Sequence, residues 1–248
     1  MSGMIALASI VPPVLAVFAV LYLGLAAFVA RSTPQNPNYL ISGFHVLIAC
    51  YVGSAALSYG ASDATLFGIG RVLALFSAGF IPVMFYVLYR EYTVGAPNPV
   101  VVAMLSIIPI TTTVLALTNA QHGLIWTAVE TESGLVFSAF RDHVWYLWVH
   151  VPFAYSLFAY SAFAIIVHLS MIAPAHRGII GLLLACALLP YAVNVADNFL
   201  GMGPPGFPFT ASALVALFPC MGYVSFRMRS QKFSPLAYRT LFDHVRDP

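Results

Sequence analysis

The chain has 248 residues, of which 61% are hydrophobic and only 7% are charged. Soluble domains contain about 25% charged residues, so the composition excludes a soluble enzyme. A disordered segment, which needs low hydrophobicity and high charge, is excluded as well. The formal net charge of +2 is too small to suggest a nucleic-acid partner, and the mean hydropathy of +0.91 indicates an integral membrane protein.

Seven long apolar segments follow one another along the chain. A spanning helix needs about 20 apolar residues plus a short connection, so a chain of this length has room for seven or eight spans. Strand-like alternation does not persist through the segments, which leaves helices as the spanning form. The sequence therefore predicts an all-α membrane protein with a seven-transmembrane-helix bundle. The predicted spans are Ile5–Ala30, Tyr39–Tyr59, Thr65–Tyr92, Pro99–Asn119, His143–Ile172, Arg177–Leu200 and Phe209–Arg227.

Basic residues in the loops predict the orientation of the bundle. With the N-terminus outside, only Arg71 and Arg141 lie on the outer side. This asymmetry predicts an outer N-terminus and a cytoplasmic C-terminus. The basic residues that then lie on the cytoplasmic side are Arg31, Arg90, Arg177, Arg227, Arg229, Lys232, Arg239 and Arg246.

The longest outer connection, residues 120–142, carries two short apolar runs, LIWTAV and LVFSAF, around a polar turn. This pattern predicts a β-hairpin between the fourth and fifth spans, at about residues 122–141, over the outer mouth of the bundle. An irregular loop is the alternative.

Residues 1–230 are predicted to form the transmembrane domain, and residues 231–248 a cytoplasmic connector helix. Ser234 is the predicted N-cap of that helix and Pro235 its first residue. A helix of this kind usually joins two domains, so we expect the chain to be a fragment of a longer protein with an output module. The apolar face of the connector would comprise Leu236, Leu241, Phe242 and Val245.

Polar residues cluster in the outer half of the predicted bundle. Ionisable groups inside a membrane are costly, which makes them candidate functional residues. In the fifth span, His143, Tyr146 and His150 are spaced to share one helix face. We predict an outer cavity that binds a ligand. Its predicted ligand-binding residues are Arg71, His122, Trp126, Trp145, His150, Tyr191, Asn194 and Asp197.

Structural interpretations of the same residues stay open. The tryptophans could form an interfacial belt together with Trp148, and Arg71 and Asp197 could form an ion pair. His150 could simply hydrogen-bond a neighbouring helix, as could His45 in the second span.

The sequence gives little support for retinal binding, metal binding, catalysis or cysteine chemistry. The only lysine, Lys232, lies outside the membrane, which excludes the Schiff base of a retinal protein. The histidines show no HxxxH or HxxH pair, and no catalytic constellation is evident, so neither a metal nor another cofactor is predicted. The three cysteines, Cys50, Cys186 and Cys220, lie in apolar runs without CxxC spacing, and we interpret them as inert packing residues.

Several motifs together resemble the N-terminal seven-transmembrane sensor region of bacterial histidine kinases, which also precedes some diguanylate cyclases. They are Phe85–Gly95, TNAQHGLIW (Thr118–Trp126), WYLWVHVPFAY (Trp145–Tyr155), LLPYAVN (Leu188–Asn194) and SPLAYRTLFDHV (Ser234–Val245). Each motif alone is weakly specific. The resemblance rests on the motifs occurring in the same order along the chain. The motif positions are occupied by Asn119, His122, Trp126, His150, Pro190 and Asn194.

The resemblance implies a receptor in the bacterial inner membrane, in which a signal changes helix packing and the seventh helix transmits the change. The predicted function is a sensory domain, itself not catalytic, that binds a small organic or amphiphilic ligand. The predicted protein is a homodimer in the lipid bilayer. The alternatives are a small transporter or channel subunit and, less well supported, a membrane enzyme that uses His122 or His150 as a base.

Overall fold

The computed structural model describes residues 2–31, 36–61, 63–130, 136–139, 143–171, 174–200 and 207–230. Within these residues, seven helices are long and apolar enough to cross a membrane. They are α1 (Ser2–Ala30), α2 (Asn36–Tyr59), α3 (Ala64–Thr93), α4 (Pro99–Leu117), α6 (Val151–His168) with the π-helix η1 (Tyr146–His150) before it, α7 (Pro174–Leu200) and α8 (Phe209–Ser230). The predicted connector helix lies outside the described residues.

Capping residues define where two of these helices begin. Asp63 precedes α3, and its Oδ1 accepts hydrogen bonds from the backbone N–H groups of Thr65 and Leu66 at 2.8 and 2.9 Å. Asn98 does the same for α4, where its Oδ1 accepts from Val100 N at 2.9 Å. Pro99 follows as the first residue of α4, a position where no N–H is needed.

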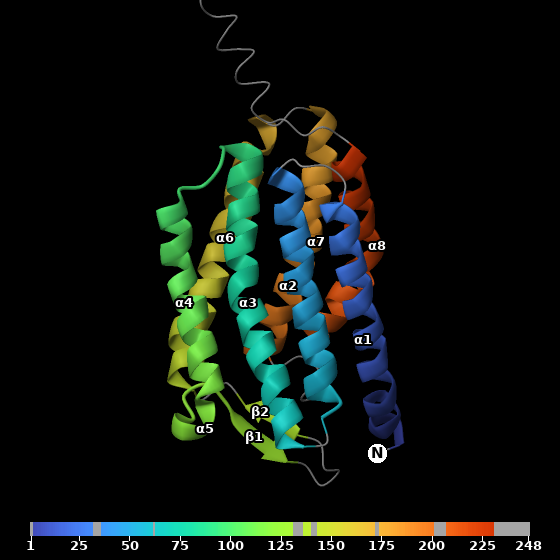
Figure 1. The fold of residues 1–248 in the computed structure, drawn as a ribbon, viewed down its shortest axis with the longest axis vertical. Helices are drawn as coiled ribbons and strands as arrows, with labels where there is room; N and C mark the ends of the chain where they lie inside the picture. Colours follow the sequence, from blue (N-terminus) through green and yellow to red (C-terminus); the bar gives the residue numbers. More distant parts are fainter. Residues whose placement is uncertain are drawn as a thin grey trace, which may run out of the picture.

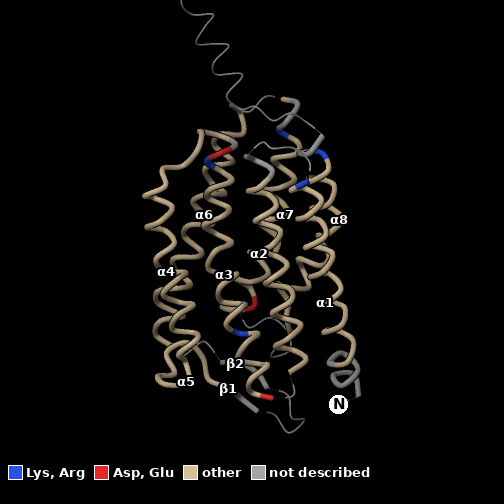
Figure 2. Tube along the Cα trace, in the orientation of Figure 1, with Lys and Arg blue, Asp and Glu red and all other residues tan. Residues whose placement is uncertain are grey.

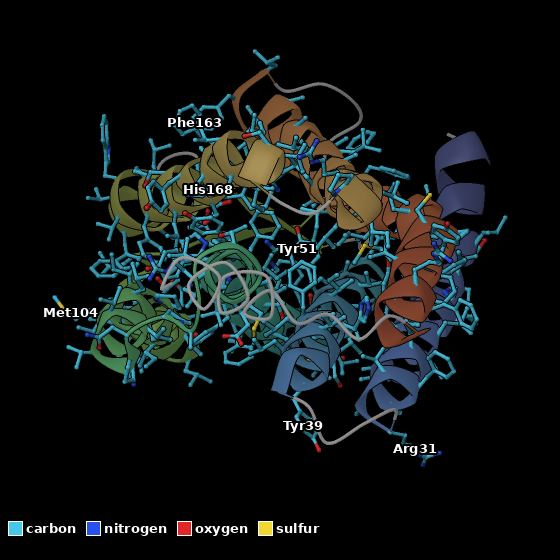
Figure 3. The ribbon with its side chains drawn as sticks, turned by 90° about the horizontal axis from the view of Figure 1, so that it is seen from above. Arg31, Tyr39, Tyr51, Met104, Phe163 and His168 are labelled. Atoms are coloured by element: carbon cyan, nitrogen blue, oxygen red, sulfur yellow. The ribbon has the colours of Figure 1, made fainter. Side chains whose placement is uncertain are left out.

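The helices pack side by side in an up-and-down bundle (Figure 1). Helix α1 packs on α2, α2 on α3, and α3 on both α4 and α6, while α8 packs on α7, α1 and α2. Seen along the bundle, Tyr51 lies among the helices, whereas Met104 and Phe163 point away from them (Figure 3). The last two side chains are 64% and 66% exposed, which fits contact with lipid in a multi-pass membrane protein.

A short two-stranded sheet lies at the end of the bundle that holds the start of α1, called here the hairpin end (Figure 1). Strands β1 (Thr127–Glu130) and β2 (Val136–Ala139) pair antiparallel, with Thr127 opposite Ala139 and Glu130 opposite Val136. The one-turn helix α5 (Asn119–His122) precedes the sheet and ends at Gly123, whose φ of 61° is in the left-handed region that glycine tolerates.

The buried side chains form two groups. The main core runs through the bundle and includes Tyr22, Phe85, Phe158 and Leu184. A satellite cluster lies near the hairpin end, and it comprises Ala61, Phe67, Leu75, Ala116, Ile125 and Trp126. Charge lies mostly at the two ends of the bundle, and in the coloured part of Figure 2 it enters the interior only in the half nearer the hairpin.

Candidate functional site

A network of polar side chains joins α6, α7 and α8 in the hairpin half. Asn194 and Asn198 are four residues apart and therefore share one face of α7. The hydroxyl of Tyr155 donates to Asn194 Oδ1, and Asn198 Nδ2 donates to both the Tyr155 hydroxyl (3.0 Å) and Asn194 Oδ1 (3.1 Å). Asn194 Nδ2 donates to Thr210 Oγ1 at 3.0 Å. We call these four residues the interhelical network.

Tyr51 and Arg71 extend the interhelical network to α2 and α3. The Tyr51 hydroxyl approaches the side chain of Thr210, and Tyr51 is also close enough to Arg71 for an electrostatic interaction. Arg71 is also close enough to Tyr146 for an electrostatic interaction, and Asp197 of α7 is close enough to Tyr51 and Tyr146 for the same. A cation, a carboxylate and several phenol groups thus gather where five helices meet.

An aromatic stack connects the interhelical network to the main core. The rings of Tyr155 and Tyr191 meet edge to face at 5.2 Å, and the Tyr191 hydroxyl donates to the Tyr155 carbonyl at 3.4 Å. Tyr191 stacks on Phe158 at 4.5 Å, and Phe158 stacks on Phe85 at 4.8 Å. The site therefore combines polar groups with flat apolar surfaces.

His150 lies at the end of the π-helix η1. Its ring stacks on Tyr146, with centroids 5.6 Å apart, and it is only 4% exposed. Its Nδ1 is buried and has no hydrogen-bond partner among the described residues. Across from it, a Cβ added at Gly79 would lie 3.5 Å from His150 Cε1, so α3 approaches the imidazole closely.

The π-helix corrects the prediction of a regular helix face in this span. Val151 N–H donates to Tyr146 O, a five-residue spacing, and the following Pro152 has no N–H with which to continue the α-helical pattern. Tyr146 and His150 lie face to face, and His143 lies just before the helix, where its carbonyl accepts a hydrogen bond from Leu147 N at 3.0 Å.

Asn119 organises the chain between α5 and β1. Its Oδ1 accepts from the backbone N–H groups of Ile125 (3.0 Å) and Trp126 (3.4 Å), and its Nδ2 donates to the Trp126 carbonyl (2.9 Å). These bonds hold Trp126 in the satellite cluster at 7% exposure. Trp145 packs beside it and donates from Nε1 to Thr112 Oγ1 at 3.0 Å.

The predicted site residues thus separate into three groups. Arg71, Tyr191, Asn194 and Asp197 come together around the interhelical network. His150 adjoins them through Tyr146. The others do not join the network. Trp126 lies in the satellite cluster and Trp145 packs against that cluster. His122 is exposed, with Nδ1 accepting from Leu124 N (3.0 Å) and Nε2 bonded to Thr118 Oγ1 (3.0 Å).

Sequence reasoning did not select four members of this site. Asn198 carried a usable signal, since it lies four residues from Asn194 on the same helix face. Tyr51, Tyr155 and Thr210 stand in apolar runs that resemble many others in the chain, and no local pattern distinguishes them.

Comparison with known families decides the class of the protein. The family described as the N-terminal 7TM region of histidine kinase matches residues 13–235, which include most of α1 and all the later spans. The chain belongs to this family. A search of curated proteins finds no match. The predicted resemblance is therefore confirmed, and the family is a sensor region that is not itself catalytic.

Proposed function

We propose that this sensor region binds a small organic molecule beside the interhelical network and transmits its presence through α8. One observation carries the proposal: Asn194 Nδ2 donates a hydrogen bond to Oγ1 of Thr210, which lies one residue after the start of α8 and which Tyr51 of α2 also approaches. Any ligand that changes how α2 or α7 presents these side chains acts directly on the last membrane helix.

The residues suggest a ligand with an anionic group and an apolar body. The Arg71 guanidinium offers several donors in a plane, a geometry that suits a carboxylate or phosphate. The rings of Tyr51, Tyr146 and Tyr155 offer apolar area together with hydroxyl groups. The buried Nδ1 of His150 supplies a further polar atom next to Tyr146.

Signalling requires that the ligand favour one of two helix arrangements, because equal affinity for both would leave their populations unchanged. The ligand site lies in the hairpin half, and α8 ends at the opposite end of the bundle (Figure 1). We propose that α8 carries the change across the bacterial inner membrane to a cytoplasmic kinase or cyclase module, within a homodimer.

Thermal unfolding of the purified chain in detergent tests the binding site. The probes are decanoate, which is an anionic amphiphile, and decan-1-ol, which has the same chain length without the charge. We expect decanoate to raise the Tm of the wild type more than decan-1-ol does. Arg71→Ala should abolish this difference between the probes, and Arg71→Lys should keep part of it.

Arg90→Ala is the matched control, because Arg90 is the same residue type in the last turn of the same helix. An equal decanoate effect in the wild type and Arg71→Ala would refute the role of Arg71. Loss of the effect in Arg90→Ala as well would show a nonspecific response to charge.

A further inference from the structure

Side-chain hydrogen bonds hold α8 to three other helices at three different levels. Asn194 of α7 bonds α8 near its start, as described above. The Tyr22 hydroxyl of α1 donates to the Leu214 carbonyl at 2.7 Å. Further along α8, the Ser225 hydroxyl shares a hydrogen bond of 2.7 Å with Nε2 of His45 in α2. The last membrane helix is therefore attached to different neighbours along its length.

Pro219 lies between the second and the third of these bonds. Because proline has no N–H, the Val215 carbonyl loses its α-helical partner, and a helix bends most readily at such a point. The first segment of α8, residues 209–218, carries the bonds from α7 and α1. The second segment, residues 220–230, carries the bond from α2 and ends opposite the hairpin (Figure 1). A bend at Pro219 would move this end while the start of α8 stays in place.

The bond between His45 and Ser225 lies deep in the bundle. His45 is 0% exposed and Ser225 is 1% exposed. The rings of Tyr22 and Phe44 lie beside the imidazole, with centroids 6.0 and 6.5 Å away. A hydrogen bond in such an apolar interior is not exchanged for one to water, so it can hold the second segment against α2.

The same histidine carries a polar atom that the packing does not satisfy. Nδ1 of His45 is buried and has no hydrogen-bond partner among the described residues. The Ser225 hydroxyl can donate to Nε2 or accept from it, and Nδ1 stays unsatisfied in either tautomer. Such a buried group costs about as much free energy as one hydrogen bond contributes, or more. His45 therefore adds little net stability to this arrangement, which suits a contact that opens and closes.

We propose that α8 is hinged at Pro219 and that the His45–Ser225 bond is a latch on its second segment. With the latch closed, the second segment packs on α2, and with the latch open it turns away from α2. Asn194 and Tyr22 hold the first segment in both cases. The use of this hinge in signalling rests on the proposed function, whereas the hinge itself needs no ligand and can be measured without one.

Distances between pairs of spin labels test the hinge in the full chain, reconstituted in nanodiscs without ligand. In a background without the native cysteines, one pair of labels replaces Tyr39 of α2 and Tyr223 of the second segment, which are 55% and 54% exposed. The other pair replaces Leu57 of α2 and Ala216 of the first segment, which are also exposed. Ser225→Ala should shift or broaden the first distance by about 1–2 Å, the size of helix movements in known switches, and leave the second unchanged.

Three further variants separate the latch from a general loosening of the bundle. His45→Phe keeps a planar ring without the nitrogens and should act like Ser225→Ala. Ser42→Ala is the matched control, because it removes a buried bond of 2.9 Å from α2 to the Ala26 carbonyl of α1 and should change neither distance. Pro219→Ala restores an N–H to α8, so adding it to Ser225→Ala should return the wild-type distances.

Three results would overturn the proposal. Unchanged distances in both Ser225→Ala and His45→Phe, or an equal change in Ser42→Ala, would rule out the latch. A shift of both label pairs would rule out the hinge, because α8 would then move as one rigid helix. Failure of Pro219→Ala to restore the distances would place the bend elsewhere. Loss of the decanoate effect concerns the ligand site alone, so the two proposals can fail independently.

Discussion

Asn194 of α7 donates a hydrogen bond from its Nδ2 to Oγ1 of Thr210 in α8, over 3.0 Å. The same Asn194 accepts from Tyr155 of α6 through its Oδ1. One amide side chain therefore joins three membrane helices, and its bond to α8 is the contact through which we expect the signal to leave the site.

Thr210→Val should uncouple the output from the ligand. Valine keeps the shape of threonine but cannot accept from Asn194, and such interhelical bonds contribute about 0.6 kcal/mol on average in membranes, so the fold should persist. We expect the decanoate effect on Tm to remain, while the change in kinase or cyclase output of the full-length receptor falls about fivefold or more.

Ser212→Ala is the control for Thr210→Val, because the Ser212 hydroxyl donates to Pro208 O at the start of the same helix instead of to another helix. A normal response from Thr210→Val would refute this route, and a lost response from Ser212→Ala would mean that any change in α8 has the same effect.

Gly70→Ala should destabilise the bundle. A Cβ at this position would lie 2.9 Å from both Ser54 O and Ser58 N and would also contact Ser58 Oγ, so α2 and α3 would have to separate. Such overpacking costs about 1–3 kcal/mol. Because Arg71 is the next residue, the decanoate effect on Tm should shrink as well. Both effects can be measured by thermal unfolding in detergent.

Gly68→Ala provides a control of opposite sign two residues away. A Cβ at Gly68 meets nothing within 4 Å, and replacing a helical glycine by alanine stabilises by up to about 1 kcal/mol. If Gly70→Ala and Gly68→Ala raised the Tm equally, the close packing of α2 on α3 at Gly70 would be incorrect.

Asn119→Ala should release Trp126 from the satellite cluster. The substitution leaves two backbone N–H groups and one carbonyl without their partner, and we expect a loss of about 2 kcal/mol. In a background with Trp145→Phe and Trp148→Phe, the remaining fluorescence should shift to longer wavelength. Gln121→Ala, at an exposed position of α5, should leave the emission unchanged. An unshifted spectrum in Asn119→Ala would contradict this role.

His45 and Ser225 should prove energetically coupled. Their side chains share a buried hydrogen bond of 2.7 Å between α2 and α8. A double-mutant cycle with His45→Ala and Ser225→Ala should give a coupling of about 0.5–1.5 kcal/mol in the free energy of unfolding. If the two substitutions lowered the free energy of unfolding in a strictly additive way, the hydrogen bond would not stabilise the packing of α2 on α8.

The orientation inferred from the basic residues can be tested by labelling intact cells. In a background without the native cysteines, a membrane-impermeant maleimide should label His122→Cys, which is exposed at the hairpin end. It should label Asn98→Cys, exposed before α4, only after the cells are permeabilised. The reverse pattern would mean that the N-terminus is cytoplasmic.

Much of the architecture could be predicted because it depends on local features. Predicted and observed helices share the same end at Ala30, Tyr59 and Leu200, since the length of an apolar run determines where a membrane helix can lie. The grouping of Arg71 with Asn194 also followed from depth, because polar residues at similar depth in neighbouring helices tend to meet.

Other features could not be read from periodicity. The π-helix at Tyr146–His150 depends on how Pro152 alters the hydrogen bonding of its own turn, which a count of residues on an ideal helix does not show. Trp126 was assigned to the ligand site, whereas Asn119 holds it in the satellite cluster through backbone bonds.

The sequence by itself determined a seven-helix membrane protein of the histidine kinase sensor family, because apolar runs and motif order are properties of the chain alone. Only the tertiary structure decided which helices touch. Helix partners in lipid are selected by close packing and individual polar contacts, not by a general hydrophobic drive. The hydrogen bonds of Asn194 with Thr210 and of His45 with Ser225 therefore cannot be predicted from periodicity in the sequence.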